Sequence, residues 1–339
     1  MRPGTETILV APSDSWPSVC AVVPTFESAA TLDAALRSLT RQRYAGEVEL
    51  LVVDGGSADS TLEIARRHGA RILHNPRREE ETGRALGIEA ATAELILLFD
   101  ADDEAVGDDW LATLVRALDA APDIVAADCL FHEWRRPDPA VTRLCALMGG
   151  SDPIAVELGW ADRWAWHLGR WTGMPIPEEE RRGDTLLVRL DPERPPPMGS
   201  NGFLVRRTEL LRTGYAPEFV HSDCVGDLAE LGFRFARVEL GVVHRYAPDL
   251  ATYFHKARRR ARRSLGGVPR QRRGYRPPPA RTLAQAVFSA SVIGPAVLAA
   301  RGCRRRPDRA WALYPVLSLI TLWAYVQEAV RHRLRASEH

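Results

Sequence analysis

Short apolar runs alternate with segments of helical periodicity through the first hundred residues of the chain. The apolar runs, which predict strands, cover residues 18–24, 48–53, 70–74 and 95–99. The segments that predict helices cover residues 29–39, 60–68 and 82–92. Alternation of this kind is typical of a mostly parallel sheet that helices cover on both faces. We therefore expect an α/β fold whose ligands bind beyond the carboxyl ends of the strands.

The pattern becomes less regular after residue 134 and changes again near residue 246. Residues 134–200 hold five of the nine tryptophans and are expected to form an insertion over the front of the sheet. Residues 199–205 predict a strand, and residues 234–244 predict the last strand of the domain. The expected division is an extension at 1–17, an α/β domain at 18–245 and a basic helical region at 246–339.

The helical region is basic although the whole chain has a formal net charge of only +1. Residues 246–339 contain 19 Lys or Arg and 4 Asp or Glu, whereas residues 1–245 contain 26 and 40. A stretch this basic is attracted to anionic lipid, nucleic acid or a phosphorylated substrate. Aromatic residues that would stack on bases are sparse here, so we expect no nucleic-acid partner.

Two uncharged apolar segments lie within the helical region, at residues 282–300 and 310–327. Each is barely long enough to cross a bilayer of about 30 Å at 1.5 Å per residue. The arginines that flank both segments conflict with two crossings under the positive-inside rule. An in-plane or re-entrant hairpin, broken at Pro295 and Pro315, fits the charges better. Two membrane spans fit the lengths of the segments nearly as well. A helical pair packed on the α/β domain is the third alternative.

The cysteines bear on the compartment of the α/β domain. Five cysteines are scattered without a C-x-x-C pair, and the N-terminus lacks the pattern of a secretory signal. We therefore expect a membrane-associated protein whose α/β domain is cytoplasmic and reduced.

Acidic residues follow the fourth predicted strand, in the run Phe99-Asp100-Ala101-Asp102-Asp103. Carboxylate oxygens are the natural ligands for Mg²⁺ or Mn²⁺, the cations that neutralise a diphosphate. An Asp-x-Asp on a tight turn can place one carboxylate on the metal and the other on a nucleoside ribose. The alternative interpretation is a solvated turn or a helix cap, because Asp is common at both.

The loops after the first two predicted strands are also polar. Residues 53–61 (VDGGSADST) contain glycines that permit close backbone approach and an Asp54 that can accept a hydrogen bond from a base N–H. Residues 24–27 (PTFE) close the first strand and are placed to flank the same base. A strand-to-helix turn capped by Ser57 or Asp59 is the alternative. Three polar loops at successive strand ends favour a shared nucleotide pocket.

The combination of these segments resembles the family-2 glycosyltransferases over roughly residues 18–245. The segments that carry the resemblance are VVPTF (22–26), LRSLTRQ (36–42), VDGGSADST (53–61), GRALG (83–87) and FDADD (99–103). The resemblance implies a GT-A (Rossmann-like) fold and an inverting transferase that takes a sugar from a UDP- or GDP-type donor with a divalent metal. Two departures from the family pattern are Glu27 and Ala85, which stand where the family often has Asn.

The resemblance also implies roles for individual residues. Thr25, Glu27 and Asp54 would touch the nucleoside, Arg84 the diphosphate and Asp100 the ribose. The nucleotide-sugar site would comprise Pro24, Thr25, Phe26, Glu27, Asp54, Ser57, Arg84, Asp100 and Ala101. The metal site would comprise Asp102, Asp103 and His244. His244 ends the last strand, where a structural histidine is the alternative.

Two later segments resemble the acceptor side of the family. Residues 199–203 (GSNGF) look like its acceptor segment, and residues 221–223 (HSD) look like the region that supplies the general base. Asp223 is the first candidate for this base and Asp227 the second, with a helix N-cap as the alternative role of Asp223.

The leading interpretation is sugar transfer to a membrane-linked acceptor such as a polyprenyl phosphate or a lipid-linked saccharide. A soluble acceptor, or a non-catalytic nucleotide-sugar-binding scaffold, is the alternative. A nucleotidyltransferase would also use paired acids and a metal, but the sequence has no Gly-rich, Lys-containing phosphate loop.

Overall fold

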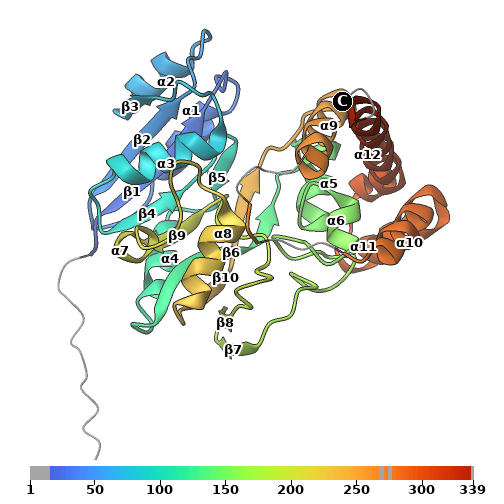
Figure 1. The fold of residues 1–339 in the computed structure, drawn as a ribbon. Helices are drawn as coiled ribbons and strands as arrows, with labels where there is room; N and C mark the ends of the chain where they lie inside the picture. Colours follow the sequence, from blue (N-terminus) through green and yellow to red (C-terminus); the bar gives the residue numbers. More distant parts are fainter. Residues whose placement is uncertain (1–15, 267–270, 274–276, 337–339) are drawn as a thin grey trace, which may run out of the picture.

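A computed structural model of the chain describes residues 16–266, 271–273 and 277–336, and its α/β part contains one mixed sheet (Figure 1). The strands are β1 (Val19–Thr25), β2 (Val48–Asp54), β3 (Arg71–His74), β4 (Leu95–Leu98), β5 (Asp103–Ala105), β6 (Ile124–Glu133), β7 (Glu178–Arg182), β8 (Thr185–Arg189), β9 (Phe203–Arg206) and β10 (Arg234–His244). Within the described residues their order is β3-β2-β1-β4-β9-β6-β10-β8-β7, and β5 pairs with β10.

The helices follow the alternation that the apolar pattern predicts. They are α1 (Leu32–Thr40), α2 (Thr61–Arg67), α3 (Glu80–Ala90), α4 (Trp110–Leu118), α5 (Ala140–Met148), α6 (Pro153–Glu157), α7 (Arg207–Leu210), α8 (His221–Glu230), α9 (Leu250–Gly266), α10 (Pro279–Ala290), α11 (Ile293–Arg305) and α12 (Tyr314–Ala336), with a 3-10 helix η1 (Arg309–Leu313).

The sheet is mostly parallel, as predicted. Strand β1 pairs in parallel with β2 and β4, β2 pairs in parallel with β3, and β6 pairs in parallel with β10. Strand β9 runs antiparallel between β4 and β6. The carboxyl ends of β1, β2 and β4 therefore meet at one edge of the sheet.

Both faces of the sheet are covered, because side chains of the first strand alternate between two hydrophobic clusters. Val19, Ala21 and Val23 pack with α1 and α4, whereas Cys20 and Val22 pack with α3 and α8. Burial on both faces explains why this strand reads as a continuous apolar run rather than an alternating one.

Helix α3 approaches the sheet closely because glycine faces β1. A Cβ at Gly87 would lie only 2.3 Å from Cγ1 of Val22, and one at Gly83 would lie 3.1 Å from Nδ2 of Asn75. The close approach buries Arg84, which lies between the two glycines and is 1% exposed. Glycine in this segment therefore positions a cation at the ligand edge of the sheet.

A third hydrophobic cluster joins the C-terminal helices, which gather beside the sheet (Figure 1). Tyr253 of α9 and Tyr314 of α12 are fully buried in it, together with Leu144 of α5. Helix α5 belongs to the expected insertion at 134–200, so the insertion packs on the C-terminal helices as well as on the sheet.

The first apolar segment is not one helix. Helices α10 and α11 meet at an angle of 79°, and the chain turns at Val292, whose φ is +59°. The Ser291 hydroxyl accepts the N–H of Gly294 and so begins α11. The predicted break at Pro295 is therefore wrong, because this proline lies in the first turn of α11, where proline is tolerated.

The second apolar segment lies in one unbroken helical run. Residues Arg309–Leu334 are long and apolar enough to cross a membrane, and 39% of their most apolar window is buried inside the protein. The break expected at Pro315 is absent, because this proline is the second residue of α12 and needs no N–H donor there.

Candidate functional site

The loops after β1 and β2 meet through the carboxylate of Asp54. Its Oδ1 accepts the Thr25 hydroxyl at 3.1 Å and the Ser57 hydroxyl at 2.6 Å. Its Oδ2 accepts the N–H groups of Gly56 and Ser57, both at 2.8 Å. Burial opposes ionisation, but these hydrogen bonds together hold the pKa of Asp54 below its usual value. The loop is therefore fixed around an ionised carboxylate.

Glu27 and Phe26 extend this loop pair toward solvent. The N–H of Glu27 donates to the Ser57 hydroxyl at 2.8 Å, and its Oε1 accepts the N–H of Ala58 at 3.0 Å. The Phe26 ring is 46% exposed, and the Arg78 guanidinium lies 5.5 Å from its centroid. An exposed ring beside the Asp54 carboxylate offers a surface on which a planar base can stack.

The loop before β9 holds the second part of the site through the side chain of Asn201. Its amide nitrogen lies 3.1 Å from Oδ2 of Asp100, 3.0 Å from Oδ1 of Asp103 and 2.9 Å from Nδ1 of His244. The amide carries two hydrogens, so at most two of these contacts are donated at once. The φ of Asn201 is +55°, a conformation that Asn tolerates better than most residues.

Asp102, Asp103 and His244 form what we call the carboxylate–imidazole cluster. Their donor atoms all lie within 4.8 Å of one another. Strand β5 pairs with β10 so that Asp103 lies opposite His244, and Nδ1 of His244 is 2.9 Å from Oδ1 of Asp103 and 3.5 Å from Oδ1 of Asp102. Burial lowers the pKa of His244, but Asp102 and Asp103 outweigh it and raise that pKa to about 9. Two carboxylates and an imidazole fit a divalent cation such as Mn²⁺.

Arg84 and Asp100 form an ion pair next to this cluster. Nη2 of Arg84 lies 2.6 Å from Oδ1 of Asp100 and also pairs with Glu80. Burial raises the pKa of Asp100 to about 7, with Glu80 and Asp103 adding to the shift and Arg84 opposing it. Nε of Arg84 is buried and has no hydrogen-bond partner within the described part of the chain.

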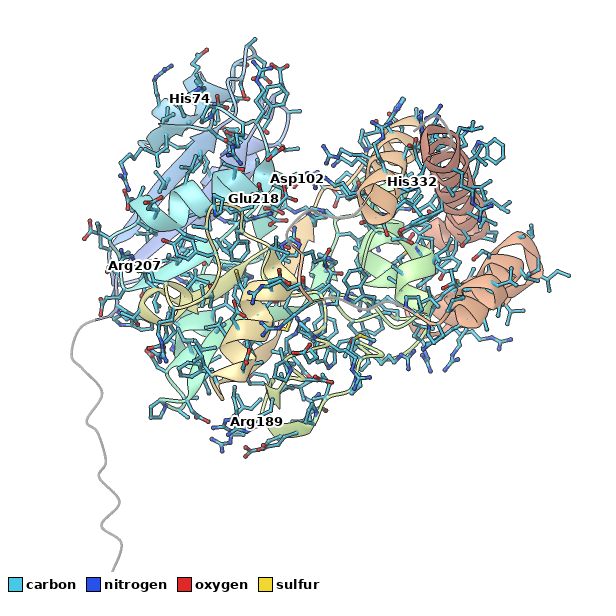
Figure 2. The ribbon with its side chains drawn as sticks, viewed as in Figure 1. His74, Asp102, Arg189, Arg207, Glu218 and His332 are labelled. Atoms are coloured by element: carbon cyan, nitrogen blue, oxygen red, sulfur yellow. The ribbon has the colours of Figure 1, made fainter. Side chains whose placement is uncertain are left out.

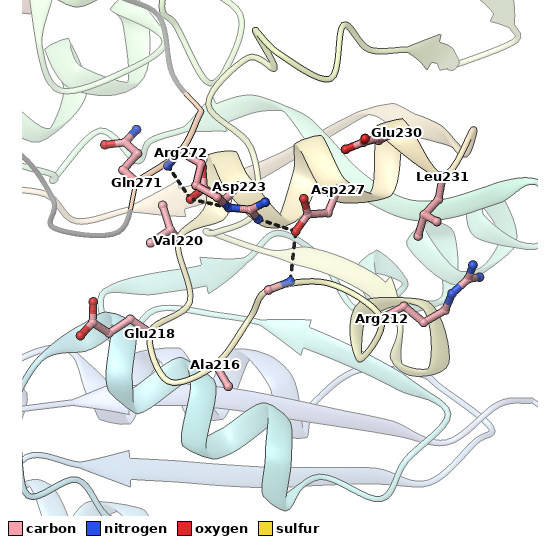
Figure 3. A pocket seen from close by; sticks show the side chains of 11 residues that line it. Arg212, Ala216, Glu218, Val220, Asp223, Asp227, Glu230, Leu231, Gln271 and Arg272 are labelled. Carbon is pink, nitrogen blue, oxygen red and sulfur yellow. Dashed lines mark hydrogen bonds and ion pairs between the residues drawn. The ribbon is translucent and has the colours of Figure 1, made fainter.

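Asp223 and Asp227 contact the linker after α9 rather than the carboxylate–imidazole cluster (Figure 3). The Asp223 carboxylate accepts the N–H groups of Arg272 and Arg273, at 2.8 and 2.7 Å. Asp227 accepts the N–H of Gly214 at 3.0 Å and pairs with both guanidinium groups. Both acids line a cavity of about 820 Å³. Among the described residues, neither forms an ion pair or hydrogen bond with the cluster.

His221, the first residue of α8, is a site residue that the sequence reasoning did not select. It packs on the Asn201 loop, since a Cβ at Gly199 would lie 2.8 Å from Cβ of His221. Burial and the charge of Arg84 lower the pKa of His221, although Glu80, Glu81 and Asp162 oppose the shift. Its Nδ1 is buried without a hydrogen-bond partner in the described structure. Its position two residues before Asp223 was the only sequence signal.

A buried ion network lies beneath the Asn201 loop. The carboxylate of Asp128 is fully buried and lies 2.8 Å from Arg163 and 3.2 Å from Arg237. Arg163 also donates to the carbonyl oxygens of Asn201, at 2.9 Å, and Ser200, at 3.3 Å. The network therefore fixes the backbone from which Asn201 reaches the acidic residues.

A small cavity of about 80 Å³ adjoins the cluster on the side of the expected insertion. His132 and Asp162 line it together with Asn201 and His244. The rings of His132 and His244 stack with centroids 5.7 Å apart, and Nε2 of His132 lies 3.4 Å from Oδ2 of Asp162. The insertion thus contributes side chains to the site.

Comparison with known proteins identifies the domain that carries this site. Residues 20–144 match the model of glycosyl transferase family 2. The chain contains a family-2 glycosyltransferase domain. The match begins within β1 and ends within α5, and it includes the Asp54 loop, Arg84 and the acidic run after β4.

Two curated relatives match parts of this chain. A PGL/p-HBAD biosynthesis glycosyltransferase of Mycobacterium tuberculosis is 36% identical over 102 residues, which cover 28% of this chain and 40% of the relative. An uncharacterized glycosyltransferase of Escherichia coli K12 is 25% identical over 154 residues, covering 42% and 44%. The chain thus spans less than half the length of these relatives.

Solved structures show a looser likeness. A mannosyltransferase from Pyrobaculum calidifontis, in complex with GDP-Man and Mn²⁺, is 18% identical and covers 95% of this chain and 91% of its own, with a TM-score of 0.49. Glucosyl-3-phosphoglycerate synthase from Mycobacterium tuberculosis, in complex with Mn²⁺ and UDP-Glc, is 18% identical and covers 72% and 77%, with a TM-score of 0.43. Likeness at this level assigns no role to individual residues of the glycosyltransferase domain.

Replacing Asp128 with Asn tests the buried ion network. The change leaves two buried guanidinium groups without a carboxylate, so we expect the free energy of unfolding to fall by about 3–5 kcal/mol in urea denaturation. The matched control is Asp123→Asn, whose side chain is 40% exposed and pairs with Arg234. It should cost less than about 1 kcal/mol. Equal small losses in both variants would contradict the role of the network.

Proposed function

We propose that the protein is a metal-dependent, inverting glycosyltransferase that moves a sugar from a UDP- or GDP-type donor to a membrane-linked acceptor. The observation that carries this proposal is that the Asp54 loop and the acidic run of the carboxylate–imidazole cluster follow parallel strands, β2 and β4, whose carboxyl ends lie at one edge of the sheet. Candidate acceptors are a polyprenyl phosphate and a lipid-linked saccharide, which both present a polar head at a lipid surface.

Donor binding is assigned to side chains of three strand ends. Thr25, Glu27 and Asp54 would hold the base, with Phe26 as the stacking surface, and Asp100 would hold the ribose. Arg84 would turn its unpaired Nε to a phosphate oxygen, a charge-assisted contact. Asp102, Asp103 and His244 would hold Mg²⁺ or Mn²⁺, which when bound supplies positive charge to the leaving diphosphate.

The general base is assigned to His221, with Asp223 as the alternative predicted from sequence. Asp223 already accepts two backbone N–H groups of the linker, whereas Nδ1 of His221 accepts none in the described structure. As the acceptor oxygen bonds to the anomeric carbon, its proton passes to the imidazole, and the bond from that carbon to the diphosphate breaks with its electron pair on the diphosphate. A base is needed for a hydroxyl acceptor, because a phosphate oxygen is already ionised at neutral pH.

Membrane association is assigned to the outer surface of the C-terminal helices (Figure 2). Helix α12 exposes a stripe of apolar side chains spaced three or four residues apart: Val316, Leu319, Trp323, Val326 and Val330. Helices α10 and α11 add Leu283, which is 67% exposed, and Ile293, which is 74% exposed. Exposed apolar surface of this extent is typical of membrane or protein interaction sites.

The charges around α12 favour a helix that lies in the membrane surface. Its other face is buried, with Leu317, Thr321 and Ala324 inaccessible to solvent. Glu328 pairs with Arg258 and Arg262 of α9, which fixes the second half of α12 to the protein. An in-plane helix keeps these ion pairs at the interface, where flanking arginines also attract anionic headgroups.

Asp102→Asn tests the proposed metal site. Removing one charged ligand should lower turnover at least about 100-fold, because stabilisation of the leaving diphosphate is worth several kcal/mol. Transfer from labelled nucleotide sugars into membrane lipid measures the effect, with Asp108→Asn on an exposed turn as the control. Near-normal turnover of Asp102→Asn with metal present would contradict the assigned role. Nucleotide-sugar binding without transfer in the parent protein would instead favour the non-catalytic scaffold.

His221→Asn tests the base with a saccharide acceptor. The turnover should fall by about 100-fold or more. His221→Asp should recover part of the rate and extend activity to lower pH, since a carboxylate stays deprotonated below the pKa of imidazole. Asp223→Asn should instead lower the melting temperature and leave the pH profile in place, because it loses linker contacts. An unchanged rate in His221→Asn would exclude this residue as the base.

Replacing Leu319, Trp323 and Val326 together with Ser tests the membrane face. The three side chains should lose enough apolar contact to reduce binding to phosphatidylglycerol-containing vesicles more than tenfold in flotation assays. Leu231→Ser, on a side chain that is 43% exposed in the glycosyltransferase part, is the matched control. Binding of the triple variant like the parent in high salt would place the membrane contact elsewhere.

A further inference from the structure

The chain has a single lysine, and the structure places it at the carboxylate–imidazole cluster. Every other residue among its 45 Lys and Arg is an arginine. Nζ of Lys256 lies 3.6 Å from Oδ2 of Asp102 and 4.6 Å from the centroid of the Tyr246 ring. The side chains of Lys256 and Asp102 are 30% and 24% exposed, so both are accessible from solvent.

Helix α9 turns one basic face toward the glycosyltransferase domain. Lys256, Arg259 and Arg263 are spaced at i, i+3 and i+7, which places them on one side of a helix. Arg263 pairs with Glu81 at 2.9 Å. The pKa of Glu80 is lowered, chiefly by Arg84 and also by the charge of Arg259. This inner face therefore runs from Asp102 to the first turn of α3, beside Arg84.

The other arginines of α9 have structural partners. Arg258 and Arg262 pair with Glu328 of α12. Arg260 donates to Ser151 and pairs with Asp152 at 3.3 Å. The basic side chains on the inner face of α9 are therefore the candidates in this helix for contact with a substrate phosphate.

We propose that Lys256 binds a phosphate group of the substrate beside the carboxylate–imidazole cluster; this inference rests on the proposed function. In the free protein the ammonium neutralises Asp102 from a distance longer than a hydrogen bond, so the pair is easily exchanged. A cation bound to Asp102 would take this carboxylate from Lys256. The ammonium would then be free to bind another anion. The donor diphosphate and a phosphate on the acceptor share the chemistry that this site recognises.

The residue type supports the assignment. An arginine at position 256 would present a planar fork that grips a carboxylate through two parallel hydrogen bonds. Such a grip on Asp102 would compete with a metal ion for the same oxygens. The ammonium of Lys256 is a compact point charge on a flexible side chain, so it can exchange the Asp102 carboxylate for a phosphate group.

Acylation of the single lysine provides a direct test on the full chain. The rate at which a water-soluble acetylating ester modifies Lys256 is followed by peptide mass spectrometry with Mn²⁺ alone as the reference. UDP or GDP with Mn²⁺ should slow the reaction at least about fivefold if the phosphate belongs to the donor. A short polyprenyl monophosphate in neutral detergent should slow it if the phosphate belongs to the acceptor. If calorimetry confirms that these ligands bind but the rate of Lys256 acetylation is unchanged, the inference is overturned and the proposed function stays in place.

The proposed function fails separately in the same design. If neither nucleotide binds with Mn²⁺ and no labelled sugar is transferred, the donor assignment is wrong whatever Lys256 does. Protection by the polyprenyl phosphate alone would then still support a phosphate site at Lys256. If no probe binds and no probe protects Lys256, both proposals are overturned.

Substitution of Lys256 gives a second readout. Lys256→Met should weaken affinity for the protecting ligand about 10–100-fold, as expected for loss of a charge-assisted hydrogen bond. Lys256→Arg should weaken Mn²⁺ binding, because the guanidinium holds Asp102. The matched control is Arg262→Met on the outer face, whose side chain is 62% exposed and pairs with Glu328. Parental affinity in a Lys256→Met variant with a normal melting temperature would contradict the assignment.

Discussion

The pairing of β5 with β10 is the contact on which the rest of the site depends. It places Asp103 opposite His244, 141 residues later in the chain, at the point where the acidic run leaves β4. Asn201 joins the two from a third direction, and the Asp128–Arg163–Arg237 network holds the backbone of its loop. A buried ion network of this kind is costly to break once formed, because each charge loses its water on folding. The geometry of the cluster therefore depends on the β5–β10 pairing and on a buried ion network that is not part of the cluster.

Local sequence patterns predicted the elements whose burial is uniform. The strands β1, β2 and β4 are apolar on both faces, so their runs stand out, and the loops that follow them met at one edge as parallel pairing requires. Long-range contacts were not readable in the same way. Asp223 is engaged by backbone N–H groups 49 and 50 residues further on, in a linker whose composition gives no sign of a partner. His221 lies in the HSD segment at 221–223, but nothing in the sequence favours it over Asp223 there.

The helical region shows how composition can mislead about exposure. The number of arginines suggests a surface wholly available to lipid, yet several of them form ion pairs within the protein. Glu328 takes Arg258 and Arg262, Glu81 takes Arg263, and Asp152 takes Arg260. The outside of α10 to α12 carries exposed apolar side chains together with exposed arginines, among them Arg301, Arg304 and Arg309. The proposed membrane face thus combines exposed valine, leucine and tryptophan with only part of the positive charge that the composition shows.

In the free protein, basic side chains of the chain itself pair with the acidic residues of the proposed metal and nucleotide site. Arg84 pairs with Asp100, His244 carries a raised pKa between two carboxylates, and Lys256 lies near Asp102. A metal ion held by the proposed ligands would require neutral imidazole and free carboxylate oxygens, so its binding would expel a proton from His244 and release Lys256 from Asp102. The expelled proton would pass to solvent, whereas the Lys256 ammonium and the Arg84 guanidinium would stay near the ion, where they would add to its attraction for a diphosphate. We therefore expect the metal ion and the nucleotide each to bind more tightly in the presence of the other, because the charge of each offsets the charge that the other brings to the site.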